Sequence, residues 1–189
     1  MKKGLIVLLG LVVIILIVIG AYFSMYNSLV SKEVAVTGAW AQVENVLQRR
    51  ADLIPNLVAT VKGYAKHEKD IFDNLAKARA QYAGAKNSDE KLKANQDISN
   101  MLSRLMVIVE NYPNLKADGT FIRLMDELAG TENRIAVERM KYNEAVKDFN
   151  TTIRTIPSSF IANRMGLTAK VFFEAEQGKK AVPNVDFGK

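Results

Sequence analysis

The chain has 189 residues, a length that leaves room for one domain beside an apolar N-terminal segment. It contains no cysteine, which excludes disulfides, thiolate nucleophiles and sulfur-ligated metals. The net charge is +6, but basic and acidic residues are interspersed rather than gathered in a basic stripe, so we expect no nucleic-acid partner.

An uncharged stretch at residues 4–23, rich in Leu, Ile and Val, follows Lys2 and Lys3. As a helix, twenty residues span about 30 Å, the thickness of a bilayer core. A cleaved signal peptide is the alternative, but its apolar core is usually only about 7–15 residues long. We therefore predict an uncleaved transmembrane anchor at residues 1–27, with the lipid bilayer as the partner of residues 4–23. The two lysines favour a cytoplasmic N-terminus and a domain on the other side of the membrane.

A heptad pattern begins after the anchor and predicts a helical stripe that faces partner helices. Its positions alternate in steps of three and four: Trp40, Val43, Leu47, Arg50, Ile54, Leu57, Val61, Tyr64, Glu68, Ile71, Leu75, Ala78 and Tyr82. Pro55 interrupts the hydrogen bonds of a helix. This region is therefore either one kinked helix or two helices that meet near residues 52–56, with Asp52 capping the second.

Two further helices are expected. After a break at residues 84–87, Ser88 is a suitable N-cap for a helix that reaches Pro113, and residues 111–119 form a loop. The last long helix shows the clearest pattern: Phe121, Met125, Leu128, Glu132, Ile135, Arg139, Tyr142, Val146, Phe149, Ile153 and Ile156. Pro157 ends this helix, Ser158 starts a short one that Gly166 interrupts, and residues 178–189 form a loose tail.

The predicted fold is therefore all-α: an N-terminal transmembrane helix followed by a long antiparallel helical bundle at residues 28–177. Four charged residues occupy apolar positions of the heptad stripes: Arg50, Glu68, Glu132 and Arg139. Because buried unpaired charges are costly, they either form ion pairs between helices or line a polar cleft, unless the stripe is misassigned. Glu132 and Arg139 are about 10 Å apart along one helix, so each needs a partner on another helix.

No catalytic, cofactor-binding or metal-binding residue is predicted. His67 is the single histidine, and the sequence His67-Glu68 is not completed to His-Glu-x-x-His or to a di-iron pattern. Phosphate-binding loops, dinucleotide-binding glycine motifs and nucleophile elbows are also missing from the sequence.

Several segments together resemble the LemA family of bacterial membrane-anchored proteins. They are Tyr26-Asn27, residues 50–58 (RADLIPNLV), residues 61–64 (VKGY), His67-Glu68, residues 112–117 (YPNLKA), residues 132–136 (ENRIA), Arg139, Tyr142-Asn143, Asn150, Pro157 and the closing Pro183-x-Val185-Asp186-Phe187. Residues 164–167 depart from the family pattern, which is more aromatic there. The resemblance implies a transmembrane helix, a four-helix-type bundle and no catalytic residue to transfer.

The function expected from these features is a non-enzymatic scaffold in the bacterial cytoplasmic membrane that binds a protein partner of unspecified identity. Two alternatives remain: an enzyme that uses the four stripe charges in a cleft, and a sensor whose bundle binds a small molecule. The sequence does not determine the oligomeric state.

Overall fold

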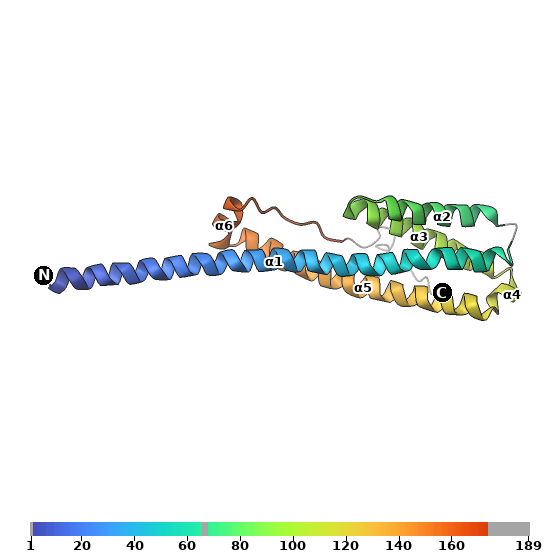
Figure 1. Ribbon diagram of the computed structural model, residues 1–189, viewed down its shortest axis with the longest axis horizontal. Helices are drawn as coiled ribbons and strands as arrows, with labels where there is room; N and C mark the ends of the chain where they lie inside the picture. The colour runs from blue at the N-terminus through green and yellow to red at the C-terminus, as the bar shows by residue number, and fades with distance from the viewer. Residues whose placement is uncertain (1, 66–67, 174–189) are drawn as a thin grey trace, which may run out of the picture. The chain divides into compact units, whose positions relative to one another are not determined.

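The computed structural model describes the backbone of residues 2–65 and 68–173 and the side chains of residues 4–65 and 68–173. This part of the chain contains helices and no strand, which confirms the all-α prediction. The helices are α1 (Lys2–Lys62), α2 (Lys69–Gly84), α3 (Ser88–Val109), α4 (Pro113–Lys116), α5 (Gly119–Arg154) and α6 (Ser158–Arg164) (Figure 1). The predicted tail at residues 178–189 and His67 lie outside the described residues.

Helix α1 is continuous through Pro55, so the region is one helix rather than two helices that meet near residues 52–56. Buried Ile54 and Leu57 flank the proline, and their packing holds the backbone helical although one hydrogen bond is lost. The N-terminal part of α1 is the one described helix long and apolar enough to cross a membrane, with a mean hydropathy of 3.3 and no buried residue in that window. These properties are consistent with a single-pass membrane protein.

The chain divides into two compact units, and α1 and α5 each contribute to both. Unit 2 comprises Ala41–Glu138 and contains the C-terminal part of α1, α2, α3, α4 and the first part of α5. The segments from α1, α2, α3 and α5 are each antiparallel to the next, and α4 lies in the connection between α3 and α5, which gives a four-helix bundle (Figure 1). Its core includes Leu47, Ile54 and Leu75 from the first heptad stripe and Ile98 and Leu105 from α3, each 1% exposed or less.

Unit 1 comprises Met1–Trp40 and Arg139–Lys189. Its core is a cluster of buried side chains from α1, α5 and α6: Leu29, Val36, Val146, Phe149, Ile153, Ile161 and Ala162. The predicted boundaries of the anchor at residue 27 and of a bundle at residues 28–177 stay predictions.

The structure corrects four details of the predicted helices. The first heptad stripe is divided between two helices, because α1 ends at Lys62 and α2 begins at Lys69, a position that neither alternative had placed. The N-cap of α3 is Asn87 instead of Ser88, because the Asn87 side chain accepts the backbone N–H of Glu90 at 2.9 Å. The predicted loop at residues 111–119 contains α4. Helix α5 ends at Arg154, so Ile156 lies beyond it and is 79% exposed.

Candidate functional site

A buried arginine connects three helices inside unit 2. The Arg50 side chain on α1 is 6% exposed, and its Nη1 lies 2.7 Å from Oε2 of Glu132 on α5. The same nitrogen donates to Asn95 Oδ1 at 3.2 Å and to Ser99 Oγ at 3.0 Å, both on α3. A guanidinium is costly to bury unless acceptors surround it. These acceptors therefore set the register of α1, α3 and α5 relative to one another.

Glu132 lies at the rim of the bundle, because its side chain is 54% exposed. Its neighbour Thr131 is 2% exposed and donates its hydroxyl to the Leu128 carbonyl oxygen at 2.7 Å. A helix of 3.6 residues per turn drifts from a strict seven-residue repeat, and here the drift turns Thr131 inward. The carboxylate of Glu132 therefore reaches Arg50 from the edge of the core.

The other two predicted stripe charges have different partners. Glu68 lies in the connection before α2, and its Oε1 accepts the Tyr112 hydroxyl at 3.1 Å. This hydrogen bond raises the pKa of the Tyr112 phenol. Arg139, in unit 1, has its guanidinium 5.7 Å from the centre of the Phe173 ring. The structure therefore brings Arg50 and Glu132 together and places Glu68 in a separate interaction beyond the end of α1, which lies about 18 Å along that helix from Arg50.

A second polar group in unit 2 joins α1, α2 and α3. Lys91 Nζ lies 2.6 Å from Glu44 Oε1, and the Tyr82 hydroxyl donates to the Glu44 carbonyl oxygen at 3.4 Å. Burial raises the pKa of Tyr82 to about 12, and the charges of Glu44 and Asp52 add to that shift. Tyr82 therefore stays neutral near pH 7 and acts as a hydrogen-bond donor.

Asp118 caps the start of α5. Its Oδ1 accepts the backbone N–H groups of Phe121 at 2.8 Å and Thr120 at 2.9 Å, and its Oδ2 accepts the Tyr64 hydroxyl at 2.8 Å. The bond from Phe121, followed by the bond from Tyr64, lowers the pKa of Asp118. The hydrogen bond to Asp118, followed by the charge of that carboxylate, also raises the pKa of the Tyr64 phenol. These groups hold the turn between α4 and α5.

An open groove between α1 and α2 has a volume of about 470 Å³. Its lining is Ile54, Pro55, Val58, Ala59, Lys62, Ala76, Arg79 and Ala80. The lining is therefore apolar, with small alanines from both helices and two cationic side chains, and it includes none of the four predicted stripe charges. Arg79 lies 4.0 Å from Asp52, a long contact between two largely exposed side chains.

In unit 1, two asparagines on α5 hold the main chain of residues 168–173, which we call the C-terminal strap. Asn150 Nδ2 donates to the Lys170 carbonyl oxygen and its Oδ1 accepts the Lys170 N–H, both at 2.9 Å. Asn143 makes the same pair of bonds with Phe173, at 2.9 and 2.8 Å. The Tyr142 hydroxyl donates to the Val171 carbonyl oxygen at 3.0 Å.

The spacing of these contacts shows how the C-terminal strap runs along α5. The seven-residue step from Asn143 to Asn150 covers about 10 Å of helix. Three residues from Lys170 to Phe173 cover the same distance only when the chain is fully extended. The C-terminal strap therefore runs extended and antiparallel to α5. Lys170 also lies 3.1 Å from Glu33 on α1 and 5.6 Å from the centre of the Phe149 ring.

Sequence reasoning missed the α3 partner of Arg50. On α3, buried Leu105, Leu102 and Ile98 are separated by steps of three and four, and the same steps continued towards the N-terminus reach Asn95 and then Lys91. Asn95 contacts Arg50, and Lys91 contacts Glu44, which was not a predicted stripe charge. The polar residues at these positions of α3 were therefore the sequence signal that could have identified the partners. The described residues contain no group of three or more His, Cys, Asp or Glu side chains placed to hold a metal ion.

Comparison with known proteins identifies related sequences. A family model described as the LemA family matches residues 39–187. Magnetosome protein MamQ 2 of Paramagnetospirillum magneticum is 26% identical over 175 residues, which cover 79% of this chain and 64% of that protein. Magnetosome protein MamQ of Magnetospirillum gryphiswaldense is 25% identical over 174 residues, which cover 78% of this chain and 64% of that protein. Protein LemA of Metamycoplasma hominis is 22% identical over 169 residues, which cover 86% of this chain and 76% of that protein. This chain thus spans less than two thirds of the length of the MamQ relatives.

Proposed function

Because this chain belongs to the LemA family, we propose that it is a non-enzymatic scaffold of the bacterial envelope, anchored by one transmembrane helix. The anchor is residues 4–23 in the cytoplasmic membrane. Lys2 and Lys3 favour a cytoplasmic N-terminus, which puts the helical bundle on the opposite side. The function of the bundle is then to hold a protein partner at the membrane.

The observation that carries this proposal is the internal use of the stripe charges. Arg50 is 6% exposed and is already in contact with Glu132, Asn95 and Ser99. A substrate-binding cleft would need that guanidinium to be accessible to a ligand. In this bundle it stabilises the arrangement of helices instead, as a register-setting polar group does.

The groove between α1 and α2 is the surface that we assign to the partner. Alanines at positions 59, 76 and 80 let a third helix approach closely, while Ile54 and Val58 offer apolar contact. Lys62 and Arg79 add positive charge to the lining. This combination suits an amphipathic helix with an apolar face and acidic residues beside it.

Photocrosslinking in membranes tests the proposal. A photoreactive amino acid at Val58 should crosslink to one protein through an amphipathic segment with acidic residues, identified by mass spectrometry. The double variant Lys62→Glu, Arg79→Glu should abolish that adduct because it repels the acidic residues. The same amino acid at Val107, an exposed position on α3, is the matched control. No adduct at Val58, or one that persists in the double variant, would refute the proposed docking site.

A small-ligand sensor is the second candidate, and one observation favours it. The groove volume of about 470 Å³ lies within the range of roughly 300–1,000 Å³ that small-molecule sites occupy. Its chemistry suits a ligand with an apolar body and an anionic end that reaches Lys62 or Arg79. Native mass spectrometry of protein extracted from membranes would show a bound small molecule that the Lys62→Glu, Arg79→Glu variant loses.

A further inference from the structure

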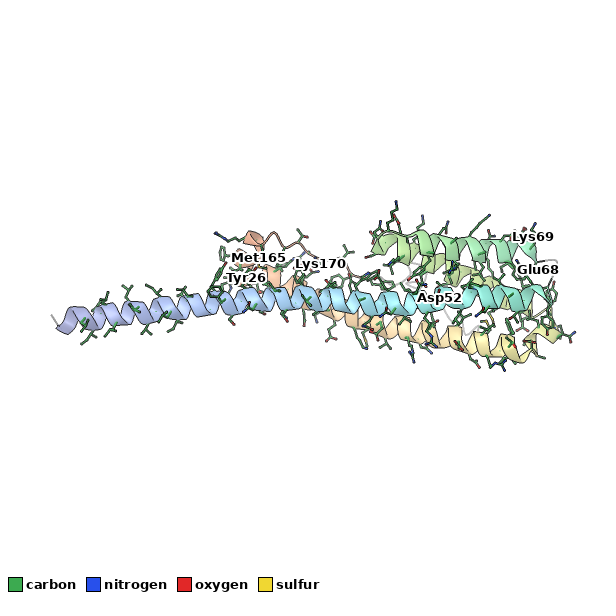
Figure 2. The ribbon with its side chains drawn as sticks, viewed as in Figure 1. Tyr26, Asp52, Glu68, Lys69, Met165 and Lys170 are labelled. Atoms are coloured by element: carbon green, nitrogen blue, oxygen red, sulfur yellow. The ribbon has the colours of Figure 1, made fainter. Side chains whose placement is uncertain are left out.

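Helix α6 packs against α1 just beyond the end of the apolar stretch. Ile161 and Ala162 of α6 are buried in the same cluster as Leu29 of α1. Met25 on α1 and Met165 after α6 pack against this cluster. Figure 2 labels Tyr26, which follows Met25 on α1, and Met165, which directly follows α6.

The end of α6 is defined by a Schellman motif. Gly166 has a φ of +70°, a left-handed conformation that glycine adopts without strain. The Leu167 N–H then donates to the Ala162 carbonyl oxygen at 3.0 Å, and the Gly166 N–H donates to the Asn163 carbonyl oxygen at 3.1 Å. Leu167 packs against the cluster as well. These contacts hold α6 on α1 at a defined height.

That height corresponds to the membrane surface. Met25 and Leu29 lie two and six residues after Phe23, or about 3 and 9 Å along the helix. The polar layer of one leaflet is about 5–8 Å thick, from a total of about 40–45 Å and a core of about 30 Å. When residues 4–23 span the bilayer core, Met25 therefore lies within the headgroup layer and Leu29 just above it, so α6 packs on α1 at the membrane surface.

The side of this region away from the cluster carries large apolar side chains. Phe160 is 71% exposed and Ile156 is 79% exposed. Arg164 lies one helical turn after Phe160 and shares its face of α6. An apolar side chain beside an arginine is the pattern of helices that lie in the membrane interface.

All charged residues in α6 and in the chain around it are basic. Residues 149–173 include Arg154, Arg164 and Lys170 but no Asp or Glu. Lys170 forms an ion pair with Glu33. In the described part of the chain, neither arginine forms an ion pair, and both are exposed. This excess of positive charge complements lipid phosphates.

We propose that α6 and the turn before it form a second membrane contact, in which Phe160 and Ile156 insert among the lipid headgroups and Arg154 and Arg164 bind lipid phosphates. The proposal rests on the membrane anchor of the proposed function. It adds that the bilayer holds unit 1 at two places, so that unit 1 has a fixed orientation on the membrane surface.

Depth-dependent fluorescence quenching tests this contact in the full-length protein in phospholipid vesicles. Since the chain has no cysteine, single cysteines can be labelled with an environment-sensitive fluorophore at Phe160, Ile15 and Met140. Met140 is the matched control because it is also an exposed apolar residue of unit 1, at 65%. Its neighbour Tyr142 contacts Trp40, with ring centres 5.4 Å apart, about 25 Å beyond Phe23 along α1.

We expect lipids spin-labelled near the headgroup to quench the probe at Phe160, and lipids spin-labelled deep in the acyl chain to quench the probe at Ile15, which lies near the middle of the bilayer core. Insertion should also shift the emission of the Phe160 probe to the blue. Neither lipid should quench the Met140 probe. A quenched Ile15 probe together with an unquenched Phe160 probe would overturn this proposal and leave the anchor standing. An unquenched Ile15 probe would overturn the anchor and the contact together. A cysteine at Ile156 provides an independent second position if the Phe160 variant loses its helical circular dichroism.

The charge part of the proposal has its own readout. Adding anionic phosphatidylglycerol to phosphatidylcholine vesicles should increase quenching at Phe160, and the double variant Arg154→Gln, Arg164→Gln should remove this increase. An unchanged response in that variant would overturn the role of the two arginines in phosphate binding.

Discussion

Removing the carboxylate of Glu132 tests the idea that Arg50 holds the bundle in register. Leaving a buried charge without compensation costs about 3–5 kcal/mol. After Glu132→Ala, however, Arg50 keeps Asn95 and Ser99 as acceptors, and the deleted carboxylate was 54% exposed. The loss is then one hydrogen bond between charged groups, about 1.5–3 kcal/mol. We expect a fall of about 2 kcal/mol in the free energy of unfolding.

Urea unfolding of the full chain in detergent, followed by circular dichroism at 222 nm, measures this loss. Glu127→Ala is the matched control, because Glu127 is 53% exposed on the same helix but its partner Arg49 is 62% exposed at 3.8 Å. An exposed pair of that kind is worth less than about 1 kcal/mol. If Glu132→Ala costs no more than Glu127→Ala, the role that we give to Arg50 is wrong.

Three further predictions concern the caps and the C-terminal strap. Gly166→Ala should lower the free energy of unfolding by about 1–2 kcal/mol, because the φ of Gly166 is +70°. Gly38→Ala should raise it by about 0.5–1 kcal/mol, because Gly38 lies in a helix with open space around it. Thermal unfolding measures both changes. Asn143→Ala should speed amide hydrogen exchange in the C-terminal strap, while Asn100→Ala on exposed α3 surface should not; equal exchange in both would contradict the asparagine contacts. The pKa of Asp118 is lowered from 3.8, so its stabilisation is present above that pH and lost as the pH falls through the folded-state value; acid unfolding of Asp118→Asn should depend less on pH below about 4.

Heptad counting predicted where charge enters the core but not which charges meet. Arg50 and Glu132 follow from stripes on two helices, because a stripe position faces a neighbour whatever the topology. Glu68 did not join them, because α1 ends at Lys62 and the stripe continues into a different helix. The counting passed through that turn because residues 63–68 contain no proline, and a break was considered only near Pro55, as one of two alternatives.

The exposure of residues at the ends of helices could not be predicted from the sequence either. Ile156 fits the α5 stripe, yet it is 79% exposed because α5 ends at Arg154 and the chain turns towards α6. The two asparagines that hold the C-terminal strap are seven residues apart, but this spacing does not identify their partners, since they bind main-chain atoms that any residue offers. The resemblance to the LemA family included these two asparagines, but it did not identify the main-chain groups that they bind.

The sequence by itself determined the elements whose cause is local. A long uncharged run predicts a membrane-spanning helix because the length and composition of one segment decide it, and the heptad stripes predict a helical bundle because 3.6-residue periodicity is a property of each helix. Tertiary structure decided the contacts that depend on how helices end and which neighbours they meet. The convergence of Arg50, Asn95 and Glu132, the groove between α1 and α2, and the packing of α6 on Leu29 all join residues far apart in the chain. Such contacts depend on the relative register of helices, which the pattern of any single segment does not encode.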